Sequence, residues 1–154
     1  MNVRAIICAT AIAMSLGPMG LSMAADDLAV MPEVKTQNRV AYLSGGIGSD
    51  QVSAMQAAAK GYGLMLTCAT RNTGEYLADV KVGITNTSGT AVLDTVTEGP
   101  ILLVRLSPGQ YRISADSNGN KVNRTVNVSA NHPVKLNLYW PERPVKSSDA
   151  EPAL

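Results

Sequence analysis

The stretch from Leu102 to Ile113 constrains the fold most strongly, because two apolar segments of β-type pattern meet at Ser107-Pro108-Gly109. Proline fixes φ at about −65° and glycine tolerates positive φ, so the chain has to change direction here. Branched residues dominate before the turn, and Tyr111, Ile113 and Ala115 alternate with polar residues after it. The pattern predicts two strands joined as a β-hairpin at the centre of an all-β domain.

Alternation with a period of two continues on both sides of this turn. It is found in residues 80–84, 91–96, 122–128 and 134–140. Asn118-Gly119 adds a strong signal for a tight hairpin, because both residues accept positive φ. Six or seven short strands, separated by turns about every eight to twelve residues, predict a Greek-key β-sandwich over residues 64–140. A closed barrel is the alternative.

One short helix is expected before the sandwich, within residues 40–63, where Val40 to Leu43 can form a short strand and a glycine-rich loop follows it. Ser49 is positioned to cap the first turn of this helix, and Gly61 and Gly63 would end it. The segment is short and rich in alanine, so it should pack on the sheet instead of standing alone. Its apolar face carries Val52, Met55, Ala59 and Tyr62.

Residues 1–24 have the pattern of a cleavable signal peptide. Arg4 supplies the positive charge, residues 5–16 the apolar segment, and Ser22-Met23-Ala24 the small residues of a cleavage site. We therefore expect a mature chain that begins at Ala25, is periplasmic or secreted, and has no stable membrane insertion. Residues 25–39 read as a linker and residues 141–154 as a disordered tail.

Charge and cysteine content narrow the function. Removing Arg4 with the leader leaves 12 of the 13 basic residues against 12 acidic ones, without a long basic run, so nucleic-acid binding is not expected. Cleavage also removes Cys8 and leaves Cys68 without an internal disulfide partner. Cys68 is in phase with Leu64 and Leu66, which predicts a buried and unreactive thiol.

Four stretches together resemble the carboxypeptidase regulatory-like domain. They are Leu77-Ala78-Asp79-Val80-Lys81-Val82, Ser88-Gly89, Leu106-Ser107-Pro108-Gly109-Gln110-Tyr111-Arg112-Ile113 and Val134-Lys135-Leu136-Asn137-Leu138. The resemblance covers about the second half of the chain. It implies a prealbumin-like sandwich of seven strands that serves exported bacterial proteins as a non-catalytic accessory module. The immunoglobulin-like fibronectin type III domain has a similar Leu-x-Pro-Gly-x-Tyr corner and implies the same fold class.

The corner residues Leu106, Pro108, Gly109 and Tyr111 are predicted to be structural. In a tyrosine corner the phenol hydroxyl bonds to the backbone a few residues upstream. We expect the same of the Tyr111 hydroxyl.

Gly45, Gly46 and Gly48 precede a helix, as the glycines of anion-binding loops do. However, Gln51 stands where the dinucleotide pattern needs a glycine, and the lysine-serine pair of a phosphate loop is missing. A tight connection between strand and helix is therefore the favoured interpretation, with anion binding as the alternative.

Two further side chains are candidates for binding. Arg124 is in phase with the inward-facing valines, so it should pair with Asp94 or Glu98 or lie at the rim of the sheet. The alternative is that Arg124 binds a ligand. Tyr139 is a candidate for stacking on a sugar ring, whereas Trp140 should pack in the core.

No catalytic, metal or cofactor site is expected, because the mature chain offers only His132 and Cys68 beside its carboxylates, and His132 lies in a turn. The sequence thus predicts a non-catalytic exported module with a binding or structural accessory role in the cell envelope. Its partner would be an envelope protein or a glycan. The alternative is a periplasmic protein that binds a small ligand or carbohydrate. Ile101 and Leu103, on the second face of an apolar strand, should be covered by the helix or by such a partner.

Overall fold

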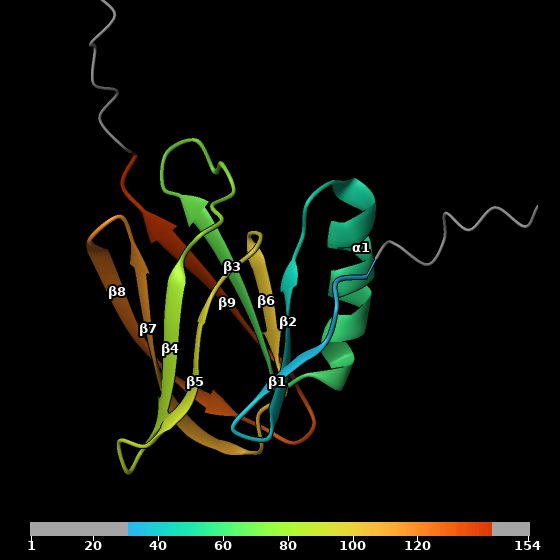
Figure 1. The fold of residues 1–154 in the computed structure, drawn as a ribbon, viewed down its shortest axis with the longest axis vertical. Coiled ribbons are helices and arrows are strands. Elements are labelled where there is room, and N and C mark those ends of the chain that lie inside the picture. The colour runs from blue at the N-terminus through green and yellow to red at the C-terminus, as the bar shows by residue number, and fades with distance from the viewer. Residues whose placement is uncertain (1–30, 143–154) are drawn as a thin grey trace, which may run out of the picture.

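Two β-sheets pack face to face in the computed structural model, which describes residues 31–142 (Figure 1). Sheet A has the order β1-β2-β6-β3-β9, formed by Lys35–Gln37, Val40–Gly45, Ile101–Val104, Leu64–Thr70 and Val134–Trp140. Sheet B has the order β5-β4-β7-β8, formed by Ala91–Val96, Lys81–Asn86, Gly109–Ser117 and Asn120–Val128. The predicted β-sandwich is confirmed, with nine strands in the described residues where six or seven were expected.

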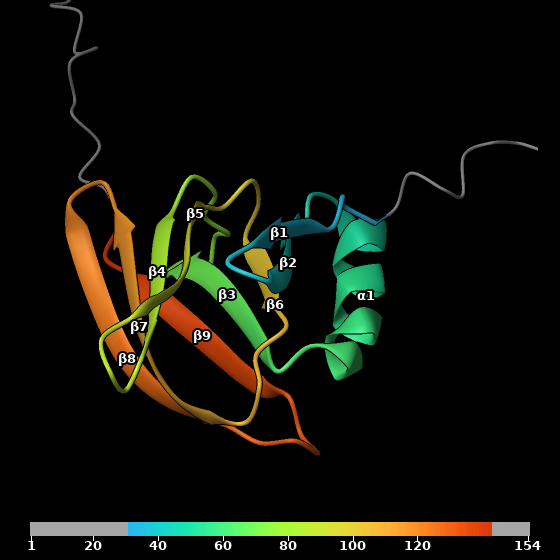
Figure 2. The same ribbon diagram turned by 60° about the horizontal axis from the view of Figure 1, so that its bottom comes forward.

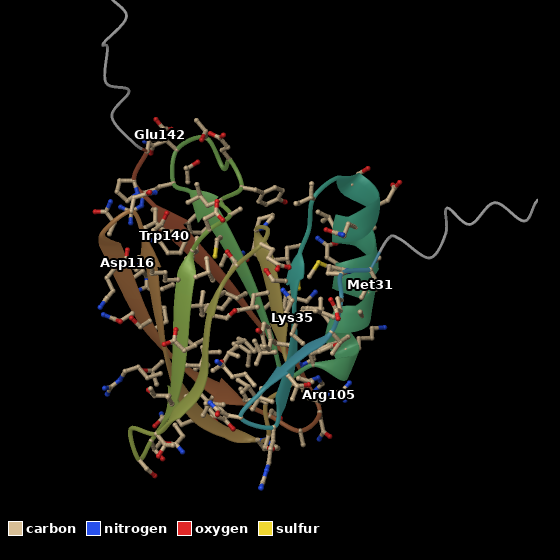
Figure 3. The ribbon with its side chains drawn as sticks, viewed as in Figure 1. Met31, Lys35, Arg105, Asp116, Trp140 and Glu142 are labelled. Atoms are coloured by element: carbon tan, nitrogen blue, oxygen red, sulfur yellow. The ribbon has the colours of Figure 1, made fainter. Side chains whose placement is uncertain are left out.

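The main core lies between the two sheets and follows from the alternation of each strand. Leu102 and Val104 of β6 point toward sheet B, as do Leu66 of β3 and Leu138 of β9. The Cys68 side chain is completely buried in the same layer, as predicted. Trp140 closes one end of this core, where its indole N–H donates a hydrogen bond of 2.7 Å to the carbonyl oxygen of Asn120 (Figure 3). That bond satisfies the one polar group of an otherwise apolar side chain.

A second, smaller core lies on the outer face of sheet A, under the helix α1 (Ser49–Ala58) and the 3₁₀ turn η2 (Ala59–Gly61) (Figure 2). Met55 and Ala59 pack there against Ile101 and Leu103, which are 1% and 0% exposed. The prediction that the helix covers these two residues is confirmed. The alternative of a partner protein on the same two side chains is wrong, because nothing of them is left at the surface.

The predicted domain boundary at Leu64 comes too late in the chain. β2 is an inner strand of sheet A, paired antiparallel with β6 from Tyr42 opposite Val104 to Gly45 opposite Ile101. β1 falls inside the predicted linker and pairs with β2. The sandwich needs these strands because β6 would otherwise expose one of its edges. The predicted signal peptide, and the predicted tail beyond residue 142, lie outside the described residues.

The expected hairpin at Ser107-Pro108-Gly109 is wrong: this segment carries the chain from sheet A to sheet B. β6 pairs with β2 and β3, whereas β7 pairs with β4 and β8. The corner itself is present, because the Tyr111 hydroxyl donates a hydrogen bond of 2.9 Å to the carbonyl oxygen of Ser107. Proline and glycine impose a change of direction, but they do not determine which strand the outgoing chain pairs with.

The crossing from β5 back to sheet A, through Glu98-Gly99-Pro100, depends on a close backbone contact. A Cβ atom added to Gly99 would lie 2.2 Å from the carbonyl oxygen of Gly45, so only glycine fits. Beside this crossing Lys35 forms a salt bridge with Glu98, and the hydrogen bond to Glu98 raises the pKa of Lys35. The Gln37 side chain accepts a hydrogen bond of 2.8 Å from the backbone N–H of Asp94. The β1–β2 hairpin thereby ties the two sheets together on this side.

Candidate functional site

A groove of about 460 Å³ runs along the outer face of sheet A, over the part that α1 leaves uncovered. Its floor consists of three side-by-side pairs from the parallel strands β3 and β9. These pairs are Met65 with Lys135, Thr67 with Asn137, and Ala69 with Tyr139. We call it the β3–β9 groove.

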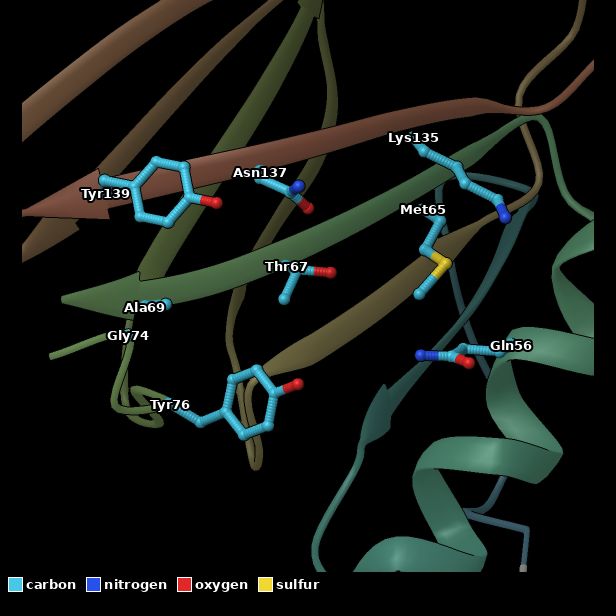
Figure 4. A pocket seen from close by; sticks show the side chains of 9 residues that line it. All are labelled: Gln56, Met65, Thr67, Ala69, Gly74, Tyr76, Lys135, Asn137 and Tyr139. Atoms are coloured by element: carbon cyan, nitrogen blue, oxygen red, sulfur yellow. The ribbon is translucent and has the colours of Figure 1, made fainter. Parts of the chain in front are cut away.

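The walls of the β3–β9 groove come from two other parts of the chain. Gln56 projects from α1 on one side, and Tyr76 from the loop between β3 and β4 on the other (Figure 4). Figure 4 shows Tyr76 and Tyr139 gathered toward one end, with Lys135, Met65 and Gln56 toward the other. The groove thus has an aromatic end and a polar end with a cationic side chain.

The exposure of the two tyrosines is the most informative property of the groove. Tyr76 is 56% exposed and Tyr139 is 46% exposed, although both rings are large apolar surfaces. The other exposed large hydrophobic side chains of the described residues lie outside the groove, at Met31, Val34, Ile47 and Val96. Two aromatic rings in one hollow are typical of a binding surface, because a tyrosine offers both an apolar ring and a polar hydroxyl.

The loop that carries Tyr76 is held by Thr70 at the end of β3. The Thr70 hydroxyl accepts a hydrogen bond of 3.0 Å from the N–H of Glu75, and the Thr70 N–H donates to the Glu75 carbonyl at 2.8 Å. A β-bridge between Ala69 and Tyr76 extends this pairing. The opposite wall is fixed by burial of Met55, next to Gln56 on α1. Both walls are therefore in place before any ligand arrives, which lowers the entropic cost of binding.

The glycine-rich loop lies outside the groove, and two of its backbone donors are already used. The Gln51 side-chain oxygen accepts hydrogen bonds from the N–H groups of Gly46 at 2.7 Å and Ile47 at 2.9 Å. Gln51, the residue that breaks the dinucleotide pattern, therefore occupies two donors that an anion-binding loop would offer to its ligand. Ser49 does not cap the helix as predicted: Gly48 is the N-cap residue, and no side chain caps the first turn.

Arg124 lies on β8, at the edge of sheet B, and its side chain is exposed. Its guanidinium donates to the neighbouring carbonyl of Asn123 at 2.9 Å, and the predicted pairing with Asp94 or Glu98 does not form. An edge strand lets a long side chain leave the inward face and reach water, which is the predicted rim position. Of the binding candidates from the sequence, only Tyr139 lines the groove.

A smaller hollow of about 270 Å³ lies at the other end of the sandwich, near the corner of Ser107. Lys60, Arg105 and His132 line it. The Arg105 guanidinium stacks over the Tyr62 ring at 5.2 Å from the ring centroid. Figure 3 shows Arg105 at the end of the molecule away from Trp140. His132 belongs to an exposed loop of this hollow.

The other residues of the groove were not identified from the sequence. Lys135 and Asn137 had a signal, because they alternate with Leu136 and Leu138 and so share a face with Tyr139. Thr67 and Gln56 had none, since their place in the groove depends on the pairing of β3 with β9 and on how α1 lies. Tyr76 belongs to a loop, where no period applies.

Comparisons with known proteins leave the chain without a family. No family model matches it, and no curated protein resembles it closely enough to count as a relative. Of what the resemblance to the carboxypeptidase regulatory-like domain implies, the β-sandwich fold is present in the structure. Within residues 31–142, no helix is long and apolar enough to cross a membrane, and no cluster of three or more His, Cys, Asp or Glu side chains could hold a metal ion.

Two solved structures align with about half of this chain. A form of BcpA, the major pilin subunit of Bacillus cereus, aligns over 49% of this chain and 28% of its own, with 16% identity and a TM-score of 0.40. The TIE protein of Bacillus anthracis aligns over 51% of this chain and 16% of its own, with 18% identity and a TM-score of 0.43. The chain spans less than a third of either protein, and likenesses this distant say nothing about its function.

Proposed function

We propose that the protein is a non-catalytic, exported β-sandwich module that binds a component of the cell envelope through the β3–β9 groove. The observation that carries this proposal is the exposure of Tyr76 and Tyr139 in one hollow whose walls are fixed in advance. Exposed apolar rings gathered in one place favour association and so lower solubility, and we therefore expect this surface to serve binding.

The groups that line the groove support binding in preference to catalysis. They are two phenols, two amides, a hydroxyl, a thioether and an ammonium group. The residues that line the groove include no carboxylate, imidazole or thiol. Phenols, amides and hydroxyls hold a ligand by stacking and hydrogen bonds.

Export to the periplasm or the medium remains part of the proposal, and it rests on the signal-peptide pattern of residues 1–24. The intact mass of the protein from the extracytoplasmic fraction tests it. A mass that begins at Ala25 is expected, and a mass that retains Met1 would contradict it.

Co-sedimentation with the insoluble cell envelope tests the binding function. The wild-type protein should pellet with washed envelope fragments, and the double variant Tyr76→Ala/Tyr139→Ala should stay in the supernatant. Val96→Ala is the matched control, because Val96 is 50% exposed on β5 of the opposite sheet. Equal sedimentation of the double variant and the wild type would refute a role for the groove.

A carbohydrate-binding or small-ligand-binding protein is the second candidate function. Tyr139 favours it, since its exposed ring lies beside Asn137 and Thr67 on the floor of the same groove. Rings with polar side chains next to them suit a ligand that is apolar on one face and carries hydroxyl groups around its rim.

A further inference from the structure

We propose that the ligand of the β3–β9 groove is an acidic oligosaccharide, with sugar rings against Tyr76 and Tyr139 and a carboxylate group at Lys135. This inference rests on the proposed function, because it names the ligand of the same groove. Four properties of the groove support it: its aromatic end, its mixed donors and acceptors, its length and its charge.

The aromatic end fits the apolar face of a sugar ring. A pyranose ring presents C–H groups on its faces and hydroxyl groups around its rim. Tyr139 lies on the floor and Tyr76 on the wall, so one ring can contact a sugar from below and the other from the side (Figure 4). The hydroxyl groups of both tyrosines remain free to bond the rim of the sugar.

The middle of the groove can both donate and accept hydrogen bonds. Asn137 and Gln56 each carry an amide with an NH₂ donor and a carbonyl acceptor, and the Thr67 hydroxyl does both. Sugar hydroxyl groups also donate and accept, so either orientation of each hydroxyl finds a partner here.

The length of the floor matches more than one sugar unit. Lys135 and Tyr139 are four residues apart on β9, which corresponds to roughly 13 Å at the usual rise of an extended strand. A single ring at the aromatic end would meet the Lys135 ammonium group only if the lysine side chain bent back along the floor. A chain of several rings can contact both ends at once.

An extended peptide fits the groove less well than a sugar does. Of the two floor strands, β3 is paired on both sides, with β6 and with β9, whereas β9 is the edge strand of sheet A. Peptides that bind as extended chains gain much of their affinity from free backbone groups at a sheet edge, and a peptide paired with the free edge of β9 would lie beside the groove and not on its floor. A ligand on the floor meets side chains, which favours a molecule that brings many hydroxyl groups of its own.

Charge selects an acidic sugar over a neutral one. Lys135 is the charged side chain among the residues that line the groove, and it is exposed. A carboxylate on the ligand would meet an ammonium group there without an opposing carboxylate. The preference should be modest and sensitive to salt, since ion pairs at exposed positions are weak and are screened.

Isothermal titration of the purified protein with defined oligosaccharides tests the inference. The acidic probes are tetragalacturonate, tetramannuronate and the tetrasaccharide of hyaluronan, and the neutral probes are cellotetraose and chitotetraose. At low salt at least one acidic probe should bind about threefold to fivefold more tightly than either neutral probe. In about 1 M NaCl the difference should vanish.

Variants assign the effect to the groove. Tyr139→Ala should weaken binding of the preferred probe by about tenfold, as expected for a lost stacking contact. Lys135→Gln should weaken the acidic probes to the level of the neutral ones and leave the neutral ones unchanged. Lys121→Gln is the control, because Lys121 is exposed on β8 of the other sheet. All three positions are exposed or half-exposed, and the Trp140 emission spectrum verifies that each variant is folded.

The possible contradictions differ in what they overturn. Neutral probes that bind as tightly as the acidic ones would refute the role of Lys135, and a short acidic peptide that binds more tightly than every sugar would refute the ligand class. If no sugar binds while envelope sedimentation still depends on Tyr76 and Tyr139, this inference fails and the proposed function stands. If sedimentation does not depend on them either, both fail.

Discussion

The corner at Tyr111 gives the sharpest stability prediction, because a single hydroxyl closes the crossing between the two sheets. Tyr111→Phe removes one hydrogen bond of 2.9 Å to the Ser107 carbonyl and leaves the ring in place. A neutral hydrogen bond contributes about 1 kcal/mol net. Ser107 is exposed, so water can take over its carbonyl oxygen, and the expected loss of unfolding free energy is about 0.5–1 kcal/mol.

Tyr111→Ala should cost more, because it also removes the ring. The ring is half-buried and packs against the main core, whereas a fully buried aromatic residue changed to alanine typically costs about 3–5 kcal/mol. Scaling for the partial burial of Tyr111 gives about 2 kcal/mol.

Urea denaturation followed by fluorescence measures both losses. The chain has a single tryptophan, and Trp140 is buried, so its emission reports loss of the core. With a slope of roughly 1–2 kcal/mol per molar urea, Tyr111→Ala should lower the midpoint by about 1–2 M and Tyr111→Phe by about 0.5 M. Tyr139→Phe is the control and should leave the midpoint unchanged. Curves for both Tyr111 variants that overlay the wild type would refute the corner.

Four further predictions concern buried side chains and one close backbone contact. Burial raises the pKa of the Cys68 thiol to about 12, so a thiol reagent should label the native protein slowly and the urea-unfolded protein fast; fast native labelling would contradict the assignment. The unfolded chain loses the thiol proton near pH 9, whereas the folded protein keeps it. The unfolding free energy should therefore fall by up to about 1.4 kcal/mol per pH unit between about pH 9 and 12. In urea titrations at these pH values, Cys68→Ala should remove that part of the slope. Gly99→Ala should destabilise the protein by more than about 2 kcal/mol in thermal melts, because its Cβ would collide with the Gly45 backbone, and an unchanged melting temperature would exclude that contact. The double variant Ile101→Thr/Leu103→Thr should lower the unfolding free energy by roughly 3 kcal/mol or more, because both side chains are buried under α1. Sedimentation of its folded fraction with the envelope should stay unchanged. Full stability with lost sedimentation would instead place a partner on these side chains.

Local patterns predicted those parts of the fold that local physics determines. Alternation identified both faces of β4 and β9, and the phase of Cys68 with Leu64 and Leu66 predicted its burial correctly. The Pro108-Gly109 turn was located correctly, but its partners were not. Both a hairpin and a crossing between sheets need the same residues at the bend, and only the pairing of distant strands distinguishes them.

The groove could not be predicted for the same reason. Its floor depends on the pairing of Thr67 with Asn137 on two parallel strands. Parallel strands are not joined by a short turn, so no turn signal in the sequence indicates that they pair. Tyr139 was recognised because it is aromatic and out of phase with Trp140. Tyr76 lies in a loop, and it lines the groove because the hydrogen bonds between Thr70 and Glu75 hold that loop at the wall.

The pairing of β3 with β9 also determines when the β3–β9 groove forms. Leu64 pairs with Val134, so residues that lie side by side on the two floor strands are 70 positions apart in the sequence. Contacts between such distant segments form late, because the intervening loop must be closed before they contribute any stability. A chain that emerges from its N-terminus onward can pair β1 with β2 and form α1 early, but β3 has to wait for β6 and β9, so there is no groove until Tyr139 has appeared. A chain shortened before Val134 would keep much of its sequence and have no β3–β9 groove.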